Sequence, residues 1–277
     1  MKRRDFLTTA CVTGLAAASF QNTQMQNVQA AEPSGQPNYL DFRMIATPNA
    51  QRLEAMTKHF GEVVIPTTNK YGLSPVGLFV ADKELNAKEA AYDKKHDSFL
   101  FSLIPHPTLD STQKLEEKLL KDTAYTEATT ALLQGASSQN PVFTSHERKL
   151  LRCFPEFPGI NVPSLDPGRI LQLRMYRSFS FERSRAKAHQ IATQEGAIEV
   201  FEACGIKSVF YSTTLYGSFM PSLVFMLYFE SEEQKNDSWA KFIRHPNWKK
   251  LADNPFYADT VTEVISIFLK PCQGSQI

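Results

Sequence analysis

The sequence lacks the short motifs that mark the common catalytic folds. It has no G-x-S-x-G nucleophile turn, no G-x-x-x-x-G-K-[ST] phosphate loop and no G-x-G-x-x-G dinucleotide fingerprint, and glycine is sparse at 12 residues. It also lacks H-E-x-x-H and C-x-x-C, and its 6 histidines are scattered singly. These absences disfavour standard serine hydrolase, nucleotide hydrolase and dinucleotide chemistry. We predict no metal site.

An excess of charge of one sign is also missing. The chain has 30 basic and 29 acidic residues, for a formal net charge of +1. A balance of this kind gives no general attraction to nucleic acid or to an anionic membrane surface. We therefore expect no nucleic-acid partner.

Cysteine is scarce as well, with 4 residues in the chain. One of them, Cys11, lies in a segment that we expect to be removed, which leaves Cys153, Cys204 and Cys272. An odd number of cysteines without paired spacing argues against a disulfide framework. Free buried thiols are the simpler expectation, although Cys153 and Cys272 each end the last strand of their half and could pair.

The chain has no apolar run long enough to span a bilayer, because the longest, over residues 7–20, falls short of the ~20 residues required. This run follows a basic start that resembles the twin-arginine export signal, and a small-residue cleavage site ends at Ala30. The residues that carry the resemblance are Arg3, Arg4, Phe6 and Leu7. We predict a signal peptide over 1–30, and an exported, periplasmic or extracellular protein with no stable membrane span.

Prolines divide the rest of the chain into two parts. Four of them fall between positions 155 and 167, and proline both removes a backbone donor and restricts the residue before it. We therefore predict a stiff linker over 154–168. It joins a first unit over 39–153, preceded by a flexible segment over 31–38, to a second unit over 169–272.

The second unit shows strand and helix patterns in the order β-α-β-β-α-β. Helices are predicted from Ser180 to Cys204 and over 232–243; the predicted strands cover 170–176, 206–215, 223–230 and 261–269. The third strand has no polar face, which is typical of burial on both sides of a sheet. This order is that of a ferredoxin-like unit.

The first unit is a fainter copy of the same plan. Leu40-Asp41-Phe42-Arg43-Met44 corresponds to Leu171-Gln172-Leu173-Arg174-Met175, and residues 122–125 stand where 245–248 stand in the second unit. A duplication of this size indicates a repeated domain rather than a solenoid. We predict an α+β fold of two tandem ferredoxin-like (βαββαβ) units, whose antiparallel sheets pack face to face in a dimeric-α/β-barrel-like architecture of eight strands.

Several segments of the second unit are familiar. They are the strand 171–176, Gly205-Ile206, the aromatic helix and corner with Trp239, Phe242, His245-Pro246 and Trp248, the segment 255–259, and the strand end Leu269-Lys270-Pro271. Together they resemble the NIPSNAP family. The resemblance implies a dimeric α/β-barrel fold, in a superfamily that includes haem-degrading and quinone-forming monooxygenases, decarboxylases and plain binding proteins. It implies no catalytic residue.

Two strand arginines, Arg43 and Arg174, are the main site candidates. If the apolar face of each strand meets the helices, both arginines point into the barrel interior, where a charge needs a partner. The remaining candidates for this interior polar cluster are Asp41, Gln172, Tyr176 and Glu263. Such a cluster could hold a carboxylate or phenolate ligand by bidentate arginine contact. The alternative is a structural arginine–carboxylate pair that joins the two sheets.

His245 and Trp248 are weaker candidates. His245 could offer its imidazole to haem or to a metal, but a helix end marked by Pro246 and a packed Trp248 is the simpler interpretation. We predict no cofactor, and haem stays an alternative.

Three classes of function follow from the sequence. The first is binding of a small, partly apolar ligand or of a protein partner, which includes a second copy of the chain. The second is a cofactor-independent monooxygenase or a haem-handling enzyme. The third is a scaffold that assembles through exposed sheet edges.

Overall fold

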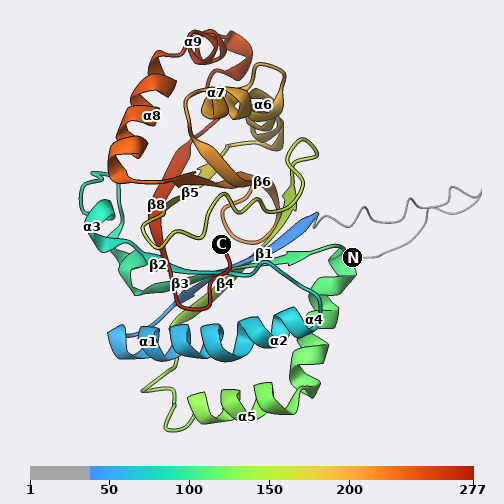
Figure 1. Cartoon of the computed structure of the whole chain (residues 1–277). Helices are drawn as coiled ribbons and strands as arrows, with labels where there is room; N and C mark the ends of the chain where they lie inside the picture. Colours follow the sequence, from blue (N-terminus) through green and yellow to red (C-terminus); the bar gives the residue numbers. More distant parts are fainter. Residues whose placement is uncertain (1–37) are drawn as a thin grey trace, which may run out of the picture. The chain divides into compact units, whose positions relative to one another are not determined.

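Eight antiparallel strands of the computed structural model, which describes residues 38–277, close into a barrel (Figure 1). The strands are β1 (Tyr39–Ala46), β2 (Gly77–Ala81), β3 (Phe99–His106), β4 (Ser145–Cys153), β5 (Ile170–Arg177), β6 (Lys207–Tyr216), β7 (Ser222–Phe229) and β8 (Glu263–Pro271). The signal residues predicted above, Arg3, Arg4, Phe6 and Leu7, lie outside the described residues.

Helices cover the barrel on two opposite sides (Figure 1). On one side lie α1 (Ala50–His59), continued by a π-helical turn (Phe60–Val64) into α2 (Ile65–Lys70), with α4 (Leu109–Lys121) and α5 (Thr123–Leu132); on the other lie α6 (Phe181–Ala192), α7 (Ala197–Ala203), α8 (Glu232–Arg244) and α9 (Pro246–Ala252). Short helical segments are α3 (Lys83–Asn86) and two 3₁₀ turns (Lys94–Ser98 and Pro255–Tyr257). Within residues 38–277, none of the helices combines the length and the apolar character that crossing a bilayer requires.

The predicted fold class is confirmed. The barrel order β1-β3-β2-β8-β5-β7-β6-β4 contains two ferredoxin-like sheets, β4-β1-β3-β2 in the N-terminal unit and β8-β5-β7-β6 in the C-terminal unit. The two sheets join edge to edge, β2 with β8 and β4 with β6. Every described strand therefore has two neighbours, so the exposed edges on which we based self-assembly are absent from this part of the chain.

The interior of the barrel is an apolar core, so the prediction that Arg43 and Arg174 point into the interior is wrong. Leu40 and Phe42 of β1 and Leu171 and Leu173 of β5 point inward into a shared buried cluster, so Arg43 and Arg174 point outward to the helices. A closed barrel of eight strands has room inside for side chains but little else. Charges are easier to accommodate on the outer face, because polar helix residues reach them there.

The two ends of the barrel are closed differently. At the end where β4 and β8 finish, Ile160, Val162 and Ile277 pack on the core. Ile277 is 1% exposed. At the other end, where β1 and β5 finish, a small cavity remains beneath the β6–β7 loop.

The predicted helix from Ser180 to Cys204 is two helices. Ser180 caps α6 as expected, since its side chain accepts a hydrogen bond from the backbone N–H of Arg183. The chain then turns over residues 193–196 before α7 begins. A Cβ atom on Gly196 would lie 2.4 Å from the carbonyl oxygen of Thr193, so this turn depends on glycine.

The predicted correspondence of 122–125 with 245–248 is a matched helical corner. Asp122 caps α5 and His245 caps α9, each at the end of the preceding helix. The two units therefore turn at the same place with different capping side chains.

The three cysteines of the described residues are free, so no Cys153–Cys272 bridge forms. Cys153 and Cys204 are buried. Burial raises the pKa of the Cys153 thiol to about 11, which keeps it protonated at neutral pH.

Candidate functional site

A pocket of about 320 Å³ lies between the outer face of β5 and the helices α6–α9. Arg174 projects into it from β5, and Lys187 reaches it from α6. The walls are largely aromatic: Tyr176, Phe201, Phe225, Trp239, Phe242 and Trp248. We refer to it below as the C-terminal pocket.

Strand alternation and register build the floor of the C-terminal pocket. Arg174 and Tyr176 share the outward face of β5, and Phe225 of β7 lies directly opposite Arg174 in the antiparallel ladder. The ring of Tyr176 meets the ring of Phe225 edge to face, with the ring centres 5.1 Å apart. The floor is therefore aromatic, and the guanidinium of Arg174 projects from it into the pocket.

The helical corner builds the opposite wall. Trp239 and Phe242 lie on the apolar face of α8, and their ring centres are 5.4 Å apart. Pro246 starts α9 in a new direction, which brings the ring of Trp248 to 4.5 Å from that of Phe242. Proline suits this first helical position because it has no N–H to leave unbonded.

Arg174 has no acidic partner among residues 38–277. Its Nε donates a hydrogen bond to the hydroxyl of Tyr176 at 2.9 Å, and its guanidinium lies 5.0 Å from the ring centre of Trp239 and 5.3 Å from that of Tyr176. Cation–π contacts of this kind partly replace the hydration of the charge. They do not neutralise it.

A second cationic side chain, that of Lys187, reaches the same pocket. Its Nζ donates to the side-chain oxygen of Gln190 at 2.6 Å and lies 5.4 Å and 5.7 Å from the ring centres of Tyr176 and Trp248. Burial, and secondarily the charge of Arg174, lowers the pKa of Lys187 to about 8. Both effects disfavour its charged form. An anion in the pocket would offset them, because it would stabilise the charged form of Lys187 and neutralise Arg174.

The equivalent arginine of the N-terminal unit is fully paired. Arg43 contacts Asp41 at 2.7 Å and Glu116 of α4 at 2.9 Å, and Arg148 also contacts Asp41 at 2.6 Å. Burial acts to raise the pKa of Asp41, but the charge of Arg43 and the hydrogen bond from Arg148 outweigh it and hold the pKa below its usual value. This cluster has the structural role given above as the alternative, although it joins β1 and β4 to α4 rather than one sheet to the other.

Within residues 38–277, both carboxylate partners of Arg43 lack an equivalent beside Arg174: no residue of α8 pairs with Arg174 as Glu116 of α4 pairs with Arg43, and the second partner is replaced on the strand itself. Gln172 stands in the C-terminal unit where Asp41 stands in the N-terminal unit. Its amide nitrogen donates to Ser266 Oγ at 2.9 Å, and its amide oxygen accepts from the indole N–H of Trp239 at 3.2 Å. The neutral amide therefore orients Trp239 and leaves the charge of Arg174 without a counterion.

The structure brings together only part of the predicted cluster. Arg174, Tyr176 and Trp248 line the C-terminal pocket, and Gln172 supports it from behind Trp239. Glu263 is exposed at the barrel end and lies 3.7 Å from Arg177, so it is no partner for Arg174. His245 caps α9 by accepting from the backbone N–H of Asn247 at 3.3 Å and is not part of the lining.

Sequence reasoning missed Lys187 and did not assign Trp239 to a site. A usable signal existed for Lys187, because it precedes Ile191 by one helical turn and therefore lies on the apolar stripe of α6. A lysine on a buried stripe needs an explanation. The position of Trp239 against Gln172 depends on how α8 packs, which no local pattern gives.

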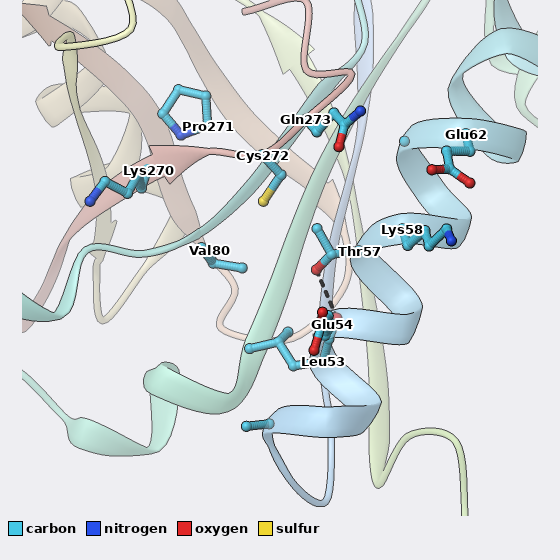
Figure 2. A pocket seen from close by; sticks show the side chains of 12 residues that line it. Leu53, Glu54, Thr57, Lys58, Glu62, Val80, Lys270, Pro271, Cys272 and Gln273 are labelled. Atoms are coloured by element: carbon cyan, nitrogen blue, oxygen red, sulfur yellow. Dashed lines mark hydrogen bonds between the residues drawn. The ribbon is translucent and has the colours of Figure 1, made fainter.

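A larger groove of about 590 Å³ runs between α1 and the end of β8 (Figure 2). The side chain of Cys272 points into it, near Val80 and Thr57. Burial raises the pKa of the Cys272 thiol to about 12, which makes it a poor nucleophile. Within residues 38–277, no three His, Cys, Asp or Glu side chains are grouped so that they could hold a metal ion.

Comparison with known proteins agrees with this architecture. Residues 171–276 match the NIPSNAP family. A NIPSNAP family protein of unknown function from Agrobacterium tumefaciens is 19% identical and covers 42% of this chain and 98% of its own, with a TM-score of 0.35. The sequence matches no curated protein.

Two solved structures are similar over most of the chain. A candidate monooxygenase from Lactobacillus acidophilus NCFM is 9% identical and covers 87% of this chain and 98% of its own, with a TM-score of 0.50. A candidate monooxygenase from Fusobacterium nucleatum is 7% identical and covers 86% and 94%, with a TM-score of 0.52. At these identities, the likeness shows the α+β barrel fold and nothing about activity.

Proposed function

We propose that this protein binds a small aromatic anion, a carboxylate or a phenolate, in the C-terminal pocket. One observation carries the proposal. Arg174 stands on the aromatic floor without a counterion, whereas its repeat equivalent Arg43 is neutralised by two carboxylates.

The free donors of Arg174 suit a carboxylate. Only its Nε is hydrogen-bonded within the described residues, so both terminal nitrogens can bind two oxygens side by side. Trp239, Phe225 and Trp248 offer ring faces and edges to the apolar part of the ligand. A volume of about 320 Å³ is within the range of small-molecule sites.

The charges around the C-terminal pocket favour anion binding. Arg174 and Lys187 are half-buried and form no ion pair within residues 38–277, and a cation partly withdrawn from water without a counterion lowers stability. An anionic ligand supplies the missing counterion, and it should raise the pKa of Lys187 when it binds. We therefore expect ligand binding to stabilise the fold as well as to fill the pocket.

Tryptophan fluorescence tests the proposal directly, because the 2 tryptophans of the sequence, Trp239 and Trp248, both line the pocket. Phenylacetate is a suitable first probe, and phenylacetamide is its uncharged control. We expect a saturable change in emission with phenylacetate and a much weaker one with phenylacetamide. Arg174→Gln should weaken phenylacetate binding by ~10-fold or more, since a charge-assisted hydrogen bond is lost.

Arg177→Gln is the matched control variant. Arg177 lies on the same strand, is exposed, contacts Glu263 and the ring of Phe219, and does not line the pocket, so its loss should leave phenylacetate binding unchanged. Equal affinity for the acid and the amide, or full affinity in Arg174→Gln, would contradict the proposal. So would the absence of binding across a panel of aryl carboxylates and phenolates.

Oxygenation of the bound aromatic is the second candidate function. Two of the solved structures that are similar over most of the chain are described as candidate monooxygenases. In this alternative, Arg174 would hold a phenolate within an aromatic pocket, and no cofactor would take part. Consumption of O₂ in the presence of a hydroquinone, above its rate in buffer and absent in Arg174→Gln, tests this alternative. This alternative does not include haem, because His245 does not line the C-terminal pocket.

We also propose that the protein is exported through its N-terminal segment. The support is the pattern of Arg3, Arg4, Phe6 and Leu7 in the sequence. Cell fractionation with N-terminal sequencing of the product tests it. Replacement of Arg3 and Arg4 by lysine should leave the full-length chain in the cytoplasm.

A further inference from the structure

Another cavity, separate from the C-terminal pocket and from the groove beside α1, lies at the end of the barrel where β1 and β5 finish. Its volume is about 110 Å³, and its apolar walls come from Met44, Phe99, Met175 and Ile265. The inward-facing Lys149 of β4 also lines it. This barrel-end cavity is distinct from the C-terminal pocket and shares no residue with it.

Lys149 is an unusual residue for this place. It lies in the inward row of β4 with Leu151 and Cys153, and it is 1% exposed. Its Nζ donates to the carbonyl oxygen of Ser218 and to Ser218 Oγ, the latter at 2.8 Å. No ion pair is formed by Lys149 within residues 38–277, although a buried ammonium usually requires one.

A short proton path leads from Lys149 to the rim. Ser218 Oγ accepts from Lys149 Nζ and donates to a carboxylate oxygen of Glu147 at 2.5 Å. Both Ser218 and Glu147 are exposed. The buried amine is therefore connected through one hydroxyl to a carboxylate in contact with water.

The loop that carries Ser218 is held in a strained conformation over Lys149. Gly217 has φ 134°, and a Cβ atom there would lie 2.8 Å from the carbonyl oxygen of Arg148. Phe219 has φ 72° without being glycine, and its ring centre is 5.7 Å from Lys149 Nζ. Glycine adopts a positive φ without strain, whereas Phe219 is strained by it, and backbone strain of this kind is concentrated at functional sites.

The charges around Lys149 leave its amine partly neutral near physiological pH. Burial lowers the pKa of Lys149 to about 8, and the charge of Glu147 opposes this only in part. The other charged or titratable groups at this end are Lys95 and His96 of the 3₁₀ turn, which line the cavity, and Arg177, whose guanidinium lies 5.3 Å from the Phe219 ring centre. The acids here, Asp93 and Glu263, are paired with Lys95 and Arg177, and neither pairs with Lys149.

We propose that Lys149 is a nucleophilic amine that condenses with a small apolar aldehyde or ketone in the barrel-end cavity. A lysine amine that is desolvated in an apolar site is an established type of Schiff-base nucleophile. An apolar cavity of about 150 Å³ holds benzene, so this one fits a molecule of roughly four carbons. The proposal is independent of the function proposed for the C-terminal pocket.

The chemistry balances with the groups present. The lone pair of Lys149 Nζ forms a bond to the carbonyl carbon while the carbonyl π electrons move to oxygen. The nitrogen loses one proton to that oxygen by way of Ser218, which gives a carbinolamine. Loss of a second nitrogen proton and departure of the oxygen as water, with a proton delivered through Glu147 and Ser218, leaves the C=N bond of the imine.

Reductive trapping on the full-length chain tests the proposal without any variant. Butanal with cyanoborohydride, which supplies the hydride that converts an imine into a stable secondary amine, is followed by peptide mapping. At pH 7, we expect Lys149 to be labelled at least ~10-fold faster than the exposed Lys249, since a far larger share of its amine is neutral. The rate at Lys149 should rise with pH and reach half its maximum near pH 8.

Two variants and one larger probe separate a reactive site from a structural one. Lys149→Arg keeps the cation and should abolish labelling at this position, whereas Ser218→Ala should slow it several-fold. Naphthaldehyde is too large for the cavity and should not label Lys149.

Saturating phenylacetate should leave the butanal reaction unchanged, so that the result does not depend on the function proposed for the C-terminal pocket. Labelling of Lys149 no faster than that of Lys249, or equal labelling by naphthaldehyde, would overturn the proposal.

Discussion

Methionine in place of Arg43 should destabilise this protein, whereas methionine in place of Arg174 should not. The two residues are equivalent in the repeat, and both lie on the outward face of the first strand of their unit. Arg43 is paired with carboxylates and Arg174 is not. The comparison therefore isolates the effect of the counterion in otherwise similar surroundings.

The loss of Arg43 should be costly. The side chains of Arg43 and Asp41 are 8% and 3% exposed, and removal of one partner from a buried pair typically costs about 3–5 kcal/mol. Asp41 would keep its contact with Arg148, whose side chain is 41% exposed. We therefore expect the lower end, about 3 kcal/mol, or a fall in Tm of roughly 6–12 °C for a domain of this size.

The loss of Arg174 should cost nothing or be favourable. Arg174→Met removes cation–π contacts with Trp239 and Tyr176, worth about 0.5–1 kcal/mol each, and one hydrogen bond of about 1 kcal/mol. It also removes an uncompensated cation, and the methionine sulfur recovers about 0.3–1.5 kcal/mol against the rings. The expected Tm is unchanged or higher by up to roughly 5 °C.

Thermal unfolding followed by circular dichroism, with urea titration as a second measure, compares the two variants with wild type. Arg177→Met is the control at an exposed position of the same strand, and its free energy of unfolding should stay within about 0.5 kcal/mol of wild type. A fall in Tm for Arg174→Met as large as that for Arg43→Met would refute the reasoning. Arg174 would then be a structural residue, and the proposed ligand would lose its main support.

Two further predictions concern pH. Burial lowers the pKa of His106 to about 4, so the unfolded chain binds more protons than the folded one between about pH 6.5 and pH 4, and stability falls as pH decreases through that window. His106→Gln should remove up to about 2–3 kcal/mol of this loss, as measured by urea titration at several pH values. An unchanged dependence of the free energy of unfolding on pH would contradict this. Phenylacetate affinity should fall as pH rises through about 8, where Lys187 loses its charge. Lys187→Met should bind phenylacetate more weakly than wild type, with an affinity that does not depend on pH in this range. A wild-type affinity independent of pH between 7 and 9 would count against a role of Lys187 in binding the anion.

Much of the architecture could be predicted because it depends on local patterns. The alternation in 170–176 and the apolar run at 223–229 identify strands, and both belong to β5 and β7 as observed. The repeat supplied the weaker elements of the first unit, including the corner at Asp122. The break between α6 and α7 could not be predicted from the helical pattern, because it depends on a tight turn at Gly196.

The candidate site was only half predictable. The sequence names Arg174, Tyr176 and Trp248 as candidates, but it predicts the first two inside the barrel and treats Trp248 as part of a separate helical corner, whereas all three line one pocket on the outer face of the sheet. Period-2 alternation separates two faces without saying which one is enclosed. Contacts that distinguish the two arginines also come from distant helices: Glu116 of α4 is 73 residues from Arg43, and Trp239 of α8 lies against Arg174.

The sequence by itself determined the order of strands and helices, the duplication, and the placement of one arginine at the same position of each unit. These follow from side-chain periodicity and from internal similarity, which act over short stretches of chain. Only the tertiary structure decided that the sheets join edge to edge, that the apolar faces enclose the barrel core, and that Arg43 is neutralised while Arg174 is not. Closure of the barrel and the packing of α4 and α8 fix these features, because each depends on which distant side chains come within a few ångströms of one another.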